Sequence, residues 1–448
     1  MRVPQSLAHA FGPEYEKILA QTAHEEGLMP DVESMHSDRF LTRSVLPHIE
    51  TLSARFNRLT PVEPGEEAMP LSAKERAEVQ AQGLDKYWKS GSNPKNLRLA
   101  YFLSFMPANQ ARIANVWAEL FRLGFNWKAR EGKNLKGIEL GAGPAAGATG
   151  IALAESILKK TYSGRSVGLP LDGNWALLEQ DRATLKLGAR WCEQTFQSYD
   201  FANWSTRLFH RSIDLEGVSI LPRTAPRFDL WISSFFLNES DSDPATIART
   251  LLETWSLHLE EEGVVILVEP ALKQQSRKFL EVRKEILKQH SHLRGAKAFP
   301  LQLLLPCLGH QTCGALAQDG DWCHEEAQWW RPGYFKKLDQ MAGLDRKTLP
   351  FSYQVWIRSD RPRSEILPAL QGLQSWARLV SPAHFEGKDQ EFFMCSPEFG
   401  KKRLRSRLSD VHGELERGDI LGDPEFRGDA AAGRLDRLSR RVDLTETP

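Results

Sequence analysis

The spacing of apolar residues changes near residue 136, and this change predicts two kinds of structure. Before that point apolar positions recur at helical spacing, most clearly within 108–122, where Ile113, Val116 and Leu120 fall on one face. Beyond it, short apolar runs alternate with helical stretches as far as about residue 290. We therefore predict a helical N-terminal domain over 1–135 and an α/β core over 136–299.

Five short apolar runs in the core have the length and boundaries of buried strands. They cover 136–140, 175–180, 205–213, 228–235 and 264–269, and helical patterns follow at 245–259 and 274–290. This alternation predicts a parallel, doubly wound, Rossmann-like sheet. The runs 351–357 and 391–395 are expected to complete this sheet as a late hairpin.

The first run ends in a turn that carries Gly141, Gly143 and Gly147 and leads directly into a helical pattern. Glycine has no Cβ, so backbone N–H groups in such a turn can approach a ligand at the carboxyl edge of the sheet. One βα unit later Glu179 ends the second run, where a carboxylate can accept hydrogen bonds from a ribose. The alternative is an ordinary strand–turn–helix whose glycines only permit tight packing.

These residues resemble the pattern of class I S-adenosylmethionine-dependent methyltransferases, whose first strand ends Glu/Asp-x-Gly-x-Gly and whose second ends in a ribose-binding acid. The resemblance implies an S-adenosylmethionine site made by Glu139, Gly141, Gly143, Glu179, Asp214 and Ser233. The sequence departs from the family at Ala145, where a third glycine is usual. After the fourth run it has neither the Asn/Asp-Pro-Pro-aromatic turn of base N-methyltransferases nor a cysteine nucleophile. Cofactor binding is therefore better supported than catalysis, and no catalytic residue is identified.

Three of the five cysteines lie in the stretch 300–332, which interrupts the predicted core and is interpreted as a Cys-rich metal-binding insert. They are Cys307, Cys313 and Cys323, with His310 and His324 among them. Clustered cysteines in an intracellular protein favour metal ligation over disulfides, although spacing does not separate zinc from iron–sulfur.

The cysteine turns add a resemblance to a narrower group of proteins. A degenerate methyltransferase core with the turns Pro306-Cys-x-x-His-x-x-Cys313 and Asp321-Trp-Cys-His324 is similar to the mitochondrial small-ribosomal-subunit assembly family of methyltransferase-like proteins and its bacterial relatives. The resemblance implies a [4Fe-4S] cluster held by Cys307, Cys313, Cys323 and Cys395. Zinc bound by three cysteines and His310 or His324 is the alternative.

The same resemblance implies a factor that binds small-subunit rRNA. Such a factor either keeps the methyltransferase fold only for binding or acts as an rRNA methyltransferase. A small-molecule S-adenosylmethionine-dependent methyltransferase with a structural zinc site is the alternative. The run 401–407 holds five Lys and Arg residues, and Trp322, Trp329 and Trp330 lie in or beside the insert. Cations meet phosphates and aromatic rings stack on bases, so both features fit RNA binding. A solvated basic face and tryptophans packed under the metal loop are the simpler explanations.

The overall composition of the chain indicates its class and its location. The chain has 448 residues, 41% of them hydrophobic, and a formal net charge of zero. No run of 18 or more apolar residues occurs, so we expect no membrane span. We also expect a monomer, located in the cytoplasm of a bacterium or in the mitochondrial matrix of a eukaryote. Residues 333–407 are expected to complete the sheet and carry the basic segment. Residues 408–448, rich in Asp, Arg and Gly, are expected to be disordered.

Overall fold

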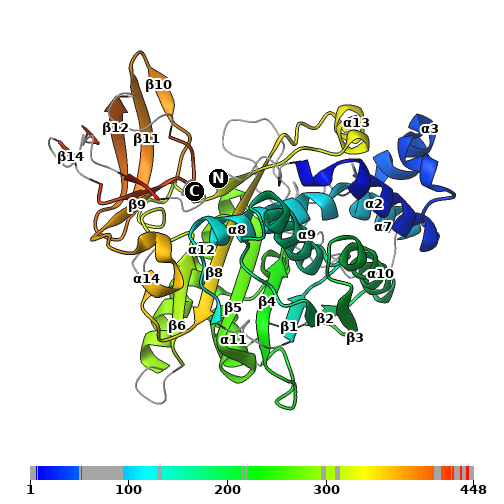
Figure 1. Cartoon of the computed structure of the whole chain (residues 1–448), viewed down its shortest axis with the longest axis horizontal. Coiled ribbons are helices and arrows are strands. Elements are labelled where there is room, and N and C mark those ends of the chain that lie inside the picture. Colours follow the sequence, from blue (N-terminus) through cyan, green and yellow to red (C-terminus); the bar gives the residue numbers. More distant parts are fainter. Residues whose placement is uncertain are drawn as a thin grey trace, which may run out of the picture.

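The computed structural model describes residues 7, 9–49, 52, 94–128, 134–213, 215–216, 219–293, 299–307, 313–407, 415–424, 426–427, 434–435 and 440–442. Two eight-stranded sheets organise this part of the chain. The first lies at the centre of the molecule, and the second stands beside it at the upper left of Figure 1, in orange and red.

The central sheet has the strand order β3-β2-β1-β4-β5-β8-β6, with β7 paired to β8. Its strands are β1 (Leu135–Leu140), β2 (Asp172–Glu179), β3 (Asn203–His210), β4 (Phe228–Ser234), β5 (Leu259–Pro270), β6 (Leu301–Leu305), β7 (Glu325–Gln328) and β8 (Thr348–Arg358). The first five run parallel, and β8 is antiparallel to β5, β6 and β7. The predicted α/β class with a mostly parallel sheet is therefore confirmed. The strand order reverses between β1 and β4, which is where open α/β sheets form their ligand crevice.

Helices cover both faces of this sheet because its buried strands are apolar on both sides. Leu177 and Ile266 belong to one hydrophobic cluster and their neighbours Leu178 and Leu267 to another. The first cluster includes residues of α7 (Pro94–Ser104), α8 (Met106–Arg122), α9 (Ala146–Thr161) and α10 (Arg182–Ser198). The second includes residues of α11 (Pro244–His258) and α12 (Lys273–Leu293).

The N-terminal helices α2 (Pro13–Glu25) and α3 (Asp38–Phe40) lie at the upper right of Figure 1. Tyr15 donates a hydrogen bond to Gln110 of α8 (2.5 Å), and its ring meets Trp191 of α10 edge to face. Residues of α2 belong to the same hydrophobic cluster as one face of the central sheet. The N-terminal helices thus pack directly on the core.

The second sheet corrects two expectations. It has the order β14-β15-β12-β11-β9-β13-β16, with β10 paired to β11. Its strands are β9 (Trp376–Leu379), β10 (His384–Glu386), β11 (Asp389–Ser396), β12 (Gly400–Arg407), β13 (Ile420–Gly422), β14 (Phe426–Arg427), β15 (Arg434–Leu435) and β16 (Arg440–Arg441). The predicted hairpin of 351–357 with 391–395 is wrong, because 391–395 lies in β11 and β8 pairs with β6 instead.

The second correction concerns 300–332 and 408–448. The supposed insert begins with β6 and ends near β7, both strands of the central sheet, so only 306–324 connects them. The described parts of 408–448 also form strands of the second sheet, although disorder was expected. Their apolar contribution is a few buried residues such as Leu421 and Leu435, too few to give a period in the sequence.

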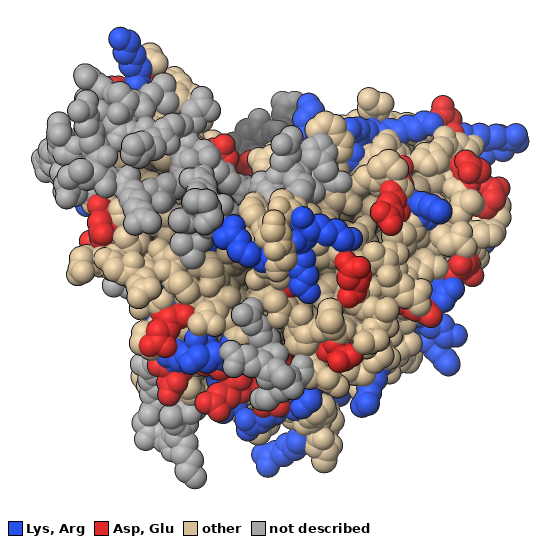
Figure 2. Space-filling model, viewed as in Figure 1, with Lys and Arg blue, Asp and Glu red and all other residues tan. Residues whose placement is uncertain are grey.

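The surface agrees with the zero net charge. On the face shown in Figure 2, Lys and Arg side chains are interspersed with Asp and Glu, and neither sign covers it alone. Within the described residues, no helix is both long enough and apolar enough to cross a membrane.

Candidate functional site

The glycine turn lies at the carboxyl end of β1, as predicted. Gly141 and Gly143 have φ values of +58° and +49°, in the left-handed region that favours glycine. A Cβ on Gly141 would lie 2.7 Å from the ring of Phe236, whereas one on Gly143 would meet nothing within 4 Å. The turn is therefore packed on one side and has open space beside Gly143.

Ala145 takes the conformation that a third glycine would have. Its φ of 61° and ψ of 47° are left-handed, and it immediately precedes α9. An alanine in this region costs about 1 kcal/mol relative to an ordinary conformation. The departure from the methyltransferase pattern therefore leaves the backbone path of the turn intact.

Glu139 holds the beginning of α9. Its Oε1 accepts a hydrogen bond from the Gly147 N–H (2.7 Å) and its Oε2 accepts one from the Ala148 N–H (2.9 Å). Burial raises the pKa of Glu139 to about 7, although these two N–H groups lower it in part. A Cβ on Gly147 would lie 2.7 Å from Glu139 Cδ. Glu139 thus positions the turn, and its predicted contact with the cofactor stays a prediction.

Glu179 reaches the turn from β2. Its Oε2 accepts a hydrogen bond from the Gly143 N–H (3.0 Å) and its Oε1 accepts one from the Asp181 N–H (2.9 Å). A carboxylate oxygen can accept a second hydrogen bond, so Glu179 keeps acceptor capacity for a ribose. Ser233 lies opposite Leu140 on β4 and is buried, with no hydrogen-bond partner for its hydroxyl in the described structure. Asp214 lies outside the described residues, and the ligand roles of all these side chains stay predictions.

The region after β4 is held by Glu269 at the end of β5. Glu269 accepts hydrogen bonds from the N–H groups of Leu237 (2.9 Å) and Asn238 (3.0 Å). With its amide oriented to satisfy both atoms, Asn238 also donates to Phe235 O (3.1 Å) and Glu269 Oε2 (2.8 Å). Asn238, one of the few groups here that could act on a substrate, is thus engaged in holding the segment. No catalytic base is identified among the residues that the structure describes.

Residues of two further helices, α7 and α8, also lie near this site. The guanidinium carbon of Arg112 on α8 is 5.0 Å from the ring centroid of Phe235, the residue after β4. Burial, and then the charges of Glu239, Glu179 and Glu139, raise the pKa of Tyr101 on α7. No role in this site was expected for Arg112 or Tyr101, which precede the glycine turn by about 30 to 40 residues in a helical pattern.

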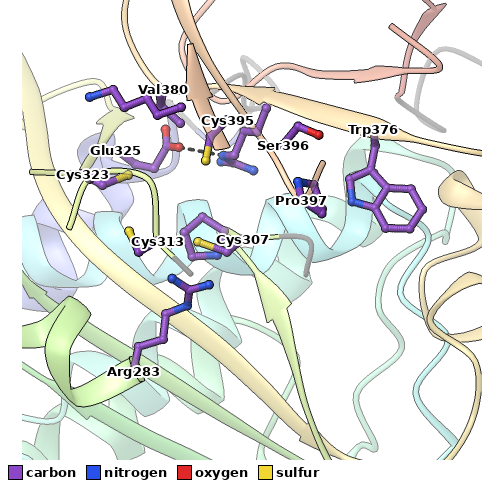
Figure 3. Close-up of a pocket in the computed structure, with 14 residues that line it drawn as sticks. Arg283, Cys307, Cys313, Cys323, Glu325, Trp376, Val380, Cys395, Ser396 and Pro397 are labelled. Carbon is purple, nitrogen blue, oxygen red and sulfur yellow. Dashed lines mark hydrogen bonds and ion pairs between the residues drawn. The ribbon is translucent and has the colours of Figure 1, made fainter. Parts of the chain in front are cut away.

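The four predicted metal ligands come together in one cavity. Cys307 follows β6, Cys313 and Cys323 lie in the connection to β7, and Cys395 lies on β11 of the second sheet. All four line a cavity of about 50 Å³ together with Arg283 of α12, and Figure 3 shows their sulfur atoms around a common space. Cys192, predicted to be a buried hydrophobe, is fully buried in α10, in the same hydrophobic cluster as α2.

Electrostatics around the cavity favour a cation among the thiolates. Burial raises the pKa of Cys323 well above its usual value and that of Cys395 to about 12, and the other cysteines raise both further. Four thiolates therefore need added positive charge. Arg283, only 3% exposed, supplies part of it, since its charge lowers the pKa of Cys307 and Cys395.

Hydrogen bonds fix the connection that carries Cys313 and Cys323. The Cys323 carbonyl accepts hydrogen bonds from the hydroxyls of Ser276 (2.6 Å) and Ser352 (3.0 Å). Lys401 of β12 forms an ion pair with Asp321 at 2.5 Å. At Gly314 a Cβ would lie 2.6 Å from the Lys401 backbone nitrogen. Glycine therefore allows the second sheet to approach the connection closely.

Cysteine is a ligand type that both zinc and iron–sulfur centres use. Within the described ranges, no group of three or more His, Cys, Asp or Glu side chains is placed to hold a metal ion. A mononuclear zinc site needs its ligands about 2.0 to 2.3 Å from one point. The irons and sulfides of a cluster instead occupy volume between the cysteines. His324 lines a smaller neighbouring cavity of about 20 Å³, and its ring stacks on Trp322. His310 lies outside the described residues.

A buried ion network joins the two sheets beside the cavity. Arg378 of β9 donates to Glu325 of β7 (Nε to Oε1, 2.8 Å) and pairs with Glu119 of α8. Tyr353 of β8 donates to Glu119 Oε2 (2.6 Å). The three charged side chains are no more than 4% exposed. Arg378, Cys395 and Lys401 are register partners across β9, β11 and β12, so one face of the second sheet carries all three toward the cavity.

Comparison with known proteins adds similarities of fold. No protein-family model matches the chain, and no curated protein matches it. Solved structures that match include a precorrin-6y C5,15-methyltransferase from Geobacter metallireducens, with 14% identity over 55% of this chain and 88% of that one, at a TM-score of 0.27. Loganic acid methyltransferase in complex with SAH has 10% identity over 59% and 96%, at a TM-score of 0.30.

A protein from Pyrococcus horikoshii assigned as an RNA methyltransferase also matches, with 10% identity over 55% of this chain and 84% of that one, at a TM-score of 0.29. These matched structures include methyltransferases named for RNA and for small molecules. Since the TM-scores are low, we rest the functional proposal on this chain's own residues.

Proposed function

We propose that this protein is an S-adenosylmethionine-binding and RNA-binding factor of the small-ribosomal-subunit assembly type, with a four-cysteine iron–sulfur centre between its two sheets. The observation that carries the proposal is that Cys307, Cys313, Cys323 and Cys395 line one cavity. The cysteine pattern is the feature that separates this family from the many proteins with a glycine turn. Cys395 comes from a different sheet, and its presence in the cavity is what a four-cysteine site requires.

The chain's own residues account for how such a centre would be held. The four cysteines would ligate it as thiolates, and Arg283 would balance part of their negative charge. Ser276 and Ser352 fix the backbone at Cys323 through its carbonyl. When bound, a [4Fe-4S] cluster supplies a cross-link between segments far apart in sequence and a one-electron redox centre.

The second sheet supports the RNA-binding part of the proposal. Phe393 of β11 is 39% exposed and lies opposite Arg403 of β12, whereas Phe385 of β10, which is 52% exposed, pairs with Gln390 and lies on the other face. Exposed aromatic rings beside cations are what single-stranded RNA binds by stacking and phosphate contact. Arg403 and Arg405 of β12 both pair with Glu391, and Arg405 also lies 3.7 Å from Glu386. Their side chains are 61% and 55% exposed, so both guanidinium groups remain accessible to a phosphate. Lys401 is the exception within the basic run, because Asp321 pairs with it.

Binding of the full chain to small-subunit rRNA fragments, followed by fluorescence anisotropy, tests this proposal. Replacing Lys402, Arg403 and Arg405 with Gln should flatten the salt dependence by about 0.7 in the log–log slope for each lost phosphate contact. A matched control replaces Lys159, Lys160 and Arg165, near the end of α9, with Gln and should leave the slope unchanged. Equal effects of both triple variants, or no binding by the wild type, would refute the RNA role.

Labelled S-adenosylmethionine then separates the two forms of the proposal. An active rRNA methyltransferase transfers the labelled methyl group to the bound RNA, whereas a binding factor does not. Since Asn238 is engaged in hydrogen bonds that hold its own segment, we expect binding without transfer.

A further inference from the structure

Arg112 lies at the end of α8 nearest the glycine turn, and its surroundings are unusual for an arginine. Gln110 donates to Thr149 Oγ1 in the first turn of α9 (Nε2 to Oγ1, 2.7 Å), and a Cβ on Gly150 would lie 3.0 Å from the Gln110 carbonyl. Residues 109–112 therefore cross directly over the beginning of α9. Arg112 extends from there to the ring of Phe235 at the end of β4.

This position is the boundary between β1 and β4. The two strands pair in parallel, with Leu140 opposite Ser233, and the strand order of the sheet reverses between them. The crevice of an open α/β sheet forms at this reversal, outside the carboxyl ends of the strands. Arg112 thus stands over the part of the crevice that lies on the β4 side of the turn, whereas Glu179 reaches the turn from the β2 side.

Arg112 has no carboxylate partner in the described part of the chain. Its hydrogen-bond partner is the side-chain oxygen of Asn109 (2.8 Å), and its Nε is buried without a hydrogen bond. Burial, and then the charge of Arg346, lower the pKa of Arg112 to about 9, while Tyr101 opposes the shift. Arg112 is only partly exposed, and a guanidinium that has lost part of its water without gaining a counter-ion is costly. The neighbouring Arg346, by contrast, pairs with Asp339 at 2.6 Å.

Phe235 holds the guanidinium in place. It has a φ of +57°, an uncommon conformation for a bulky residue, and its N–H donates to the Val268 carbonyl at 2.7 Å. Such conformations persist where the surrounding structure over-determines them, often at ligand sites. The ring covers one face of Arg112 through a cation–π contact and leaves the edge of the guanidinium to hydrogen-bond an anion.

We propose that Arg112 binds the carboxylate of the amino-acid part of S-adenosylmethionine. This inference rests on the proposed binding of that cofactor at the glycine turn. With the ribose on the Glu179 side, the amino-acid part extends across β1 toward β4 and meets Arg112. A guanidinium fork binds a carboxylate through two parallel hydrogen bonds, which gives both affinity and orientation.

Decarboxylated S-adenosylmethionine provides the test, because it keeps the nucleoside, the sulfonium and the amine and lacks only the carboxylate. Calorimetry on the full chain should show that the wild type prefers S-adenosylmethionine to this analogue about tenfold to hundredfold, the range of a charge-assisted hydrogen-bonded pair. Arg112→Gln should lose that preference and keep its affinity for the analogue. Arg112→Lys should restore part of the preference, and it keeps the test usable if the Gln variant folds poorly.

The other outcomes separate this inference from the proposed function. If the wild type binds neither compound, both the cofactor site and the role of Arg112 are wrong. If the wild type binds both equally well, or if Arg112→Gln weakens both to the same degree, cofactor binding stands and the carboxylate contact is refuted. A variant that loses rRNA affinity while keeping its preference for S-adenosylmethionine would assign Arg112 to an RNA phosphate instead and overturn the proposal.

Discussion

The proposed cofactor crevice and the cysteine cavity are built in opposite ways. The turn of the crevice is one continuous segment, from Glu139 to Ala148, and backbone N–H groups bonded to Glu139 and Glu179 fix it. The cavity draws its cysteines from positions 307 to 395 and from two sheets. It is held by side chains, chiefly the buried pairs of Arg378 and the ion pair of Lys401 with Asp321.

This difference separates what each site needs in order to form. The glycine turn and the two carboxylates that fix it need only the first two βα units of the central sheet. The cavity needs the second sheet to be docked on the first, because Cys395 is otherwise absent from it. Binding at the crevice therefore reports on the core, whereas metal retention at the cavity reports on the contact between the sheets.

The largest effect is expected from breaking that contact. Arg378→Gln leaves Glu119 and Glu325 buried without their cation, and removing one partner of a buried ion pair costs about 3 to 5 kcal/mol. We expect a much lower free energy of unfolding in urea and loss of the metal. Arg403→Gln on the same sheet, where Arg403 is 61% exposed, is the control and should change little. Similar urea midpoints for the two variants would show that the Arg378 network does not hold the sheets together.

The pH dependence of stability should have opposite signs in the two regions. The pKa of Glu139 rises from 4.5 to about 7, so the folded protein binds more protons than the unfolded chain between these values. Its contribution is present at pH 4 and is lost as the pH rises through 7, by about 3 kcal/mol. Burial would raise the pKa of Glu119, but Arg378 lowers it, so the contribution of Glu119 is lost as the pH falls instead.

Urea unfolding of the wild type and Glu139→Gln at pH 5 and pH 8 measures the first of these effects. The variant should be less stable at pH 5, because Gln accepts only one of the two N–H hydrogen bonds, and its stability should fall less toward pH 8. An unchanged difference between the two pH values would mean that Glu139 does not carry a proton in this range.

The smallest effect on stability is expected at the glycine turn, where binding should change most. Gly143→Val places a side chain in the open space beside the turn, at a φ of +49°. Gly164→Val is matched in backbone strain, with a φ of +89° and open space, but lies beyond the end of α9. Each should cost about 1 to 2 kcal/mol. Calorimetry should show loss of S-adenosylmethionine binding only in Gly143→Val, and retained binding there would place the cofactor elsewhere.

The same contrast explains what could be predicted from the sequence. The strands, the helices of the core and the glycine turn depend on neighbouring residues, whose periods are visible along the chain. The assignment of 391–395 to the central sheet failed because Phe392-Phe-Met-Cys395 is a short apolar run, as a strand of either sheet could be, and only the burial of β11 alternates. Such a pattern specifies a strand without naming the sheet that it joins.

Side chains that reach a site from distant elements could not be predicted from the sequence either. Arg112 belongs to an amphipathic helix, Arg283 is one of several cations along α12, and Arg378 is the one cation of the short strand β9. Cys395 was predicted only through the family resemblance, since nothing within 70 residues of Cys323 marks it as a partner. Contacts of this kind depend on how sheets and helices pack, and no local period encodes that packing.

The central claim is that four cysteines from two sheets hold one iron–sulfur cluster, and the metal content of anaerobically purified protein tests it most directly. We predict a brown wild-type protein with about four iron and four sulfide per chain, as the [4Fe-4S] type requires. Cys395→Ser should lose that content, and Cys192→Ser, whose cysteine is buried in α10 away from the cavity, should retain it. A colourless protein that holds one zinc, and keeps it in Cys395→Ser, would contradict the claim.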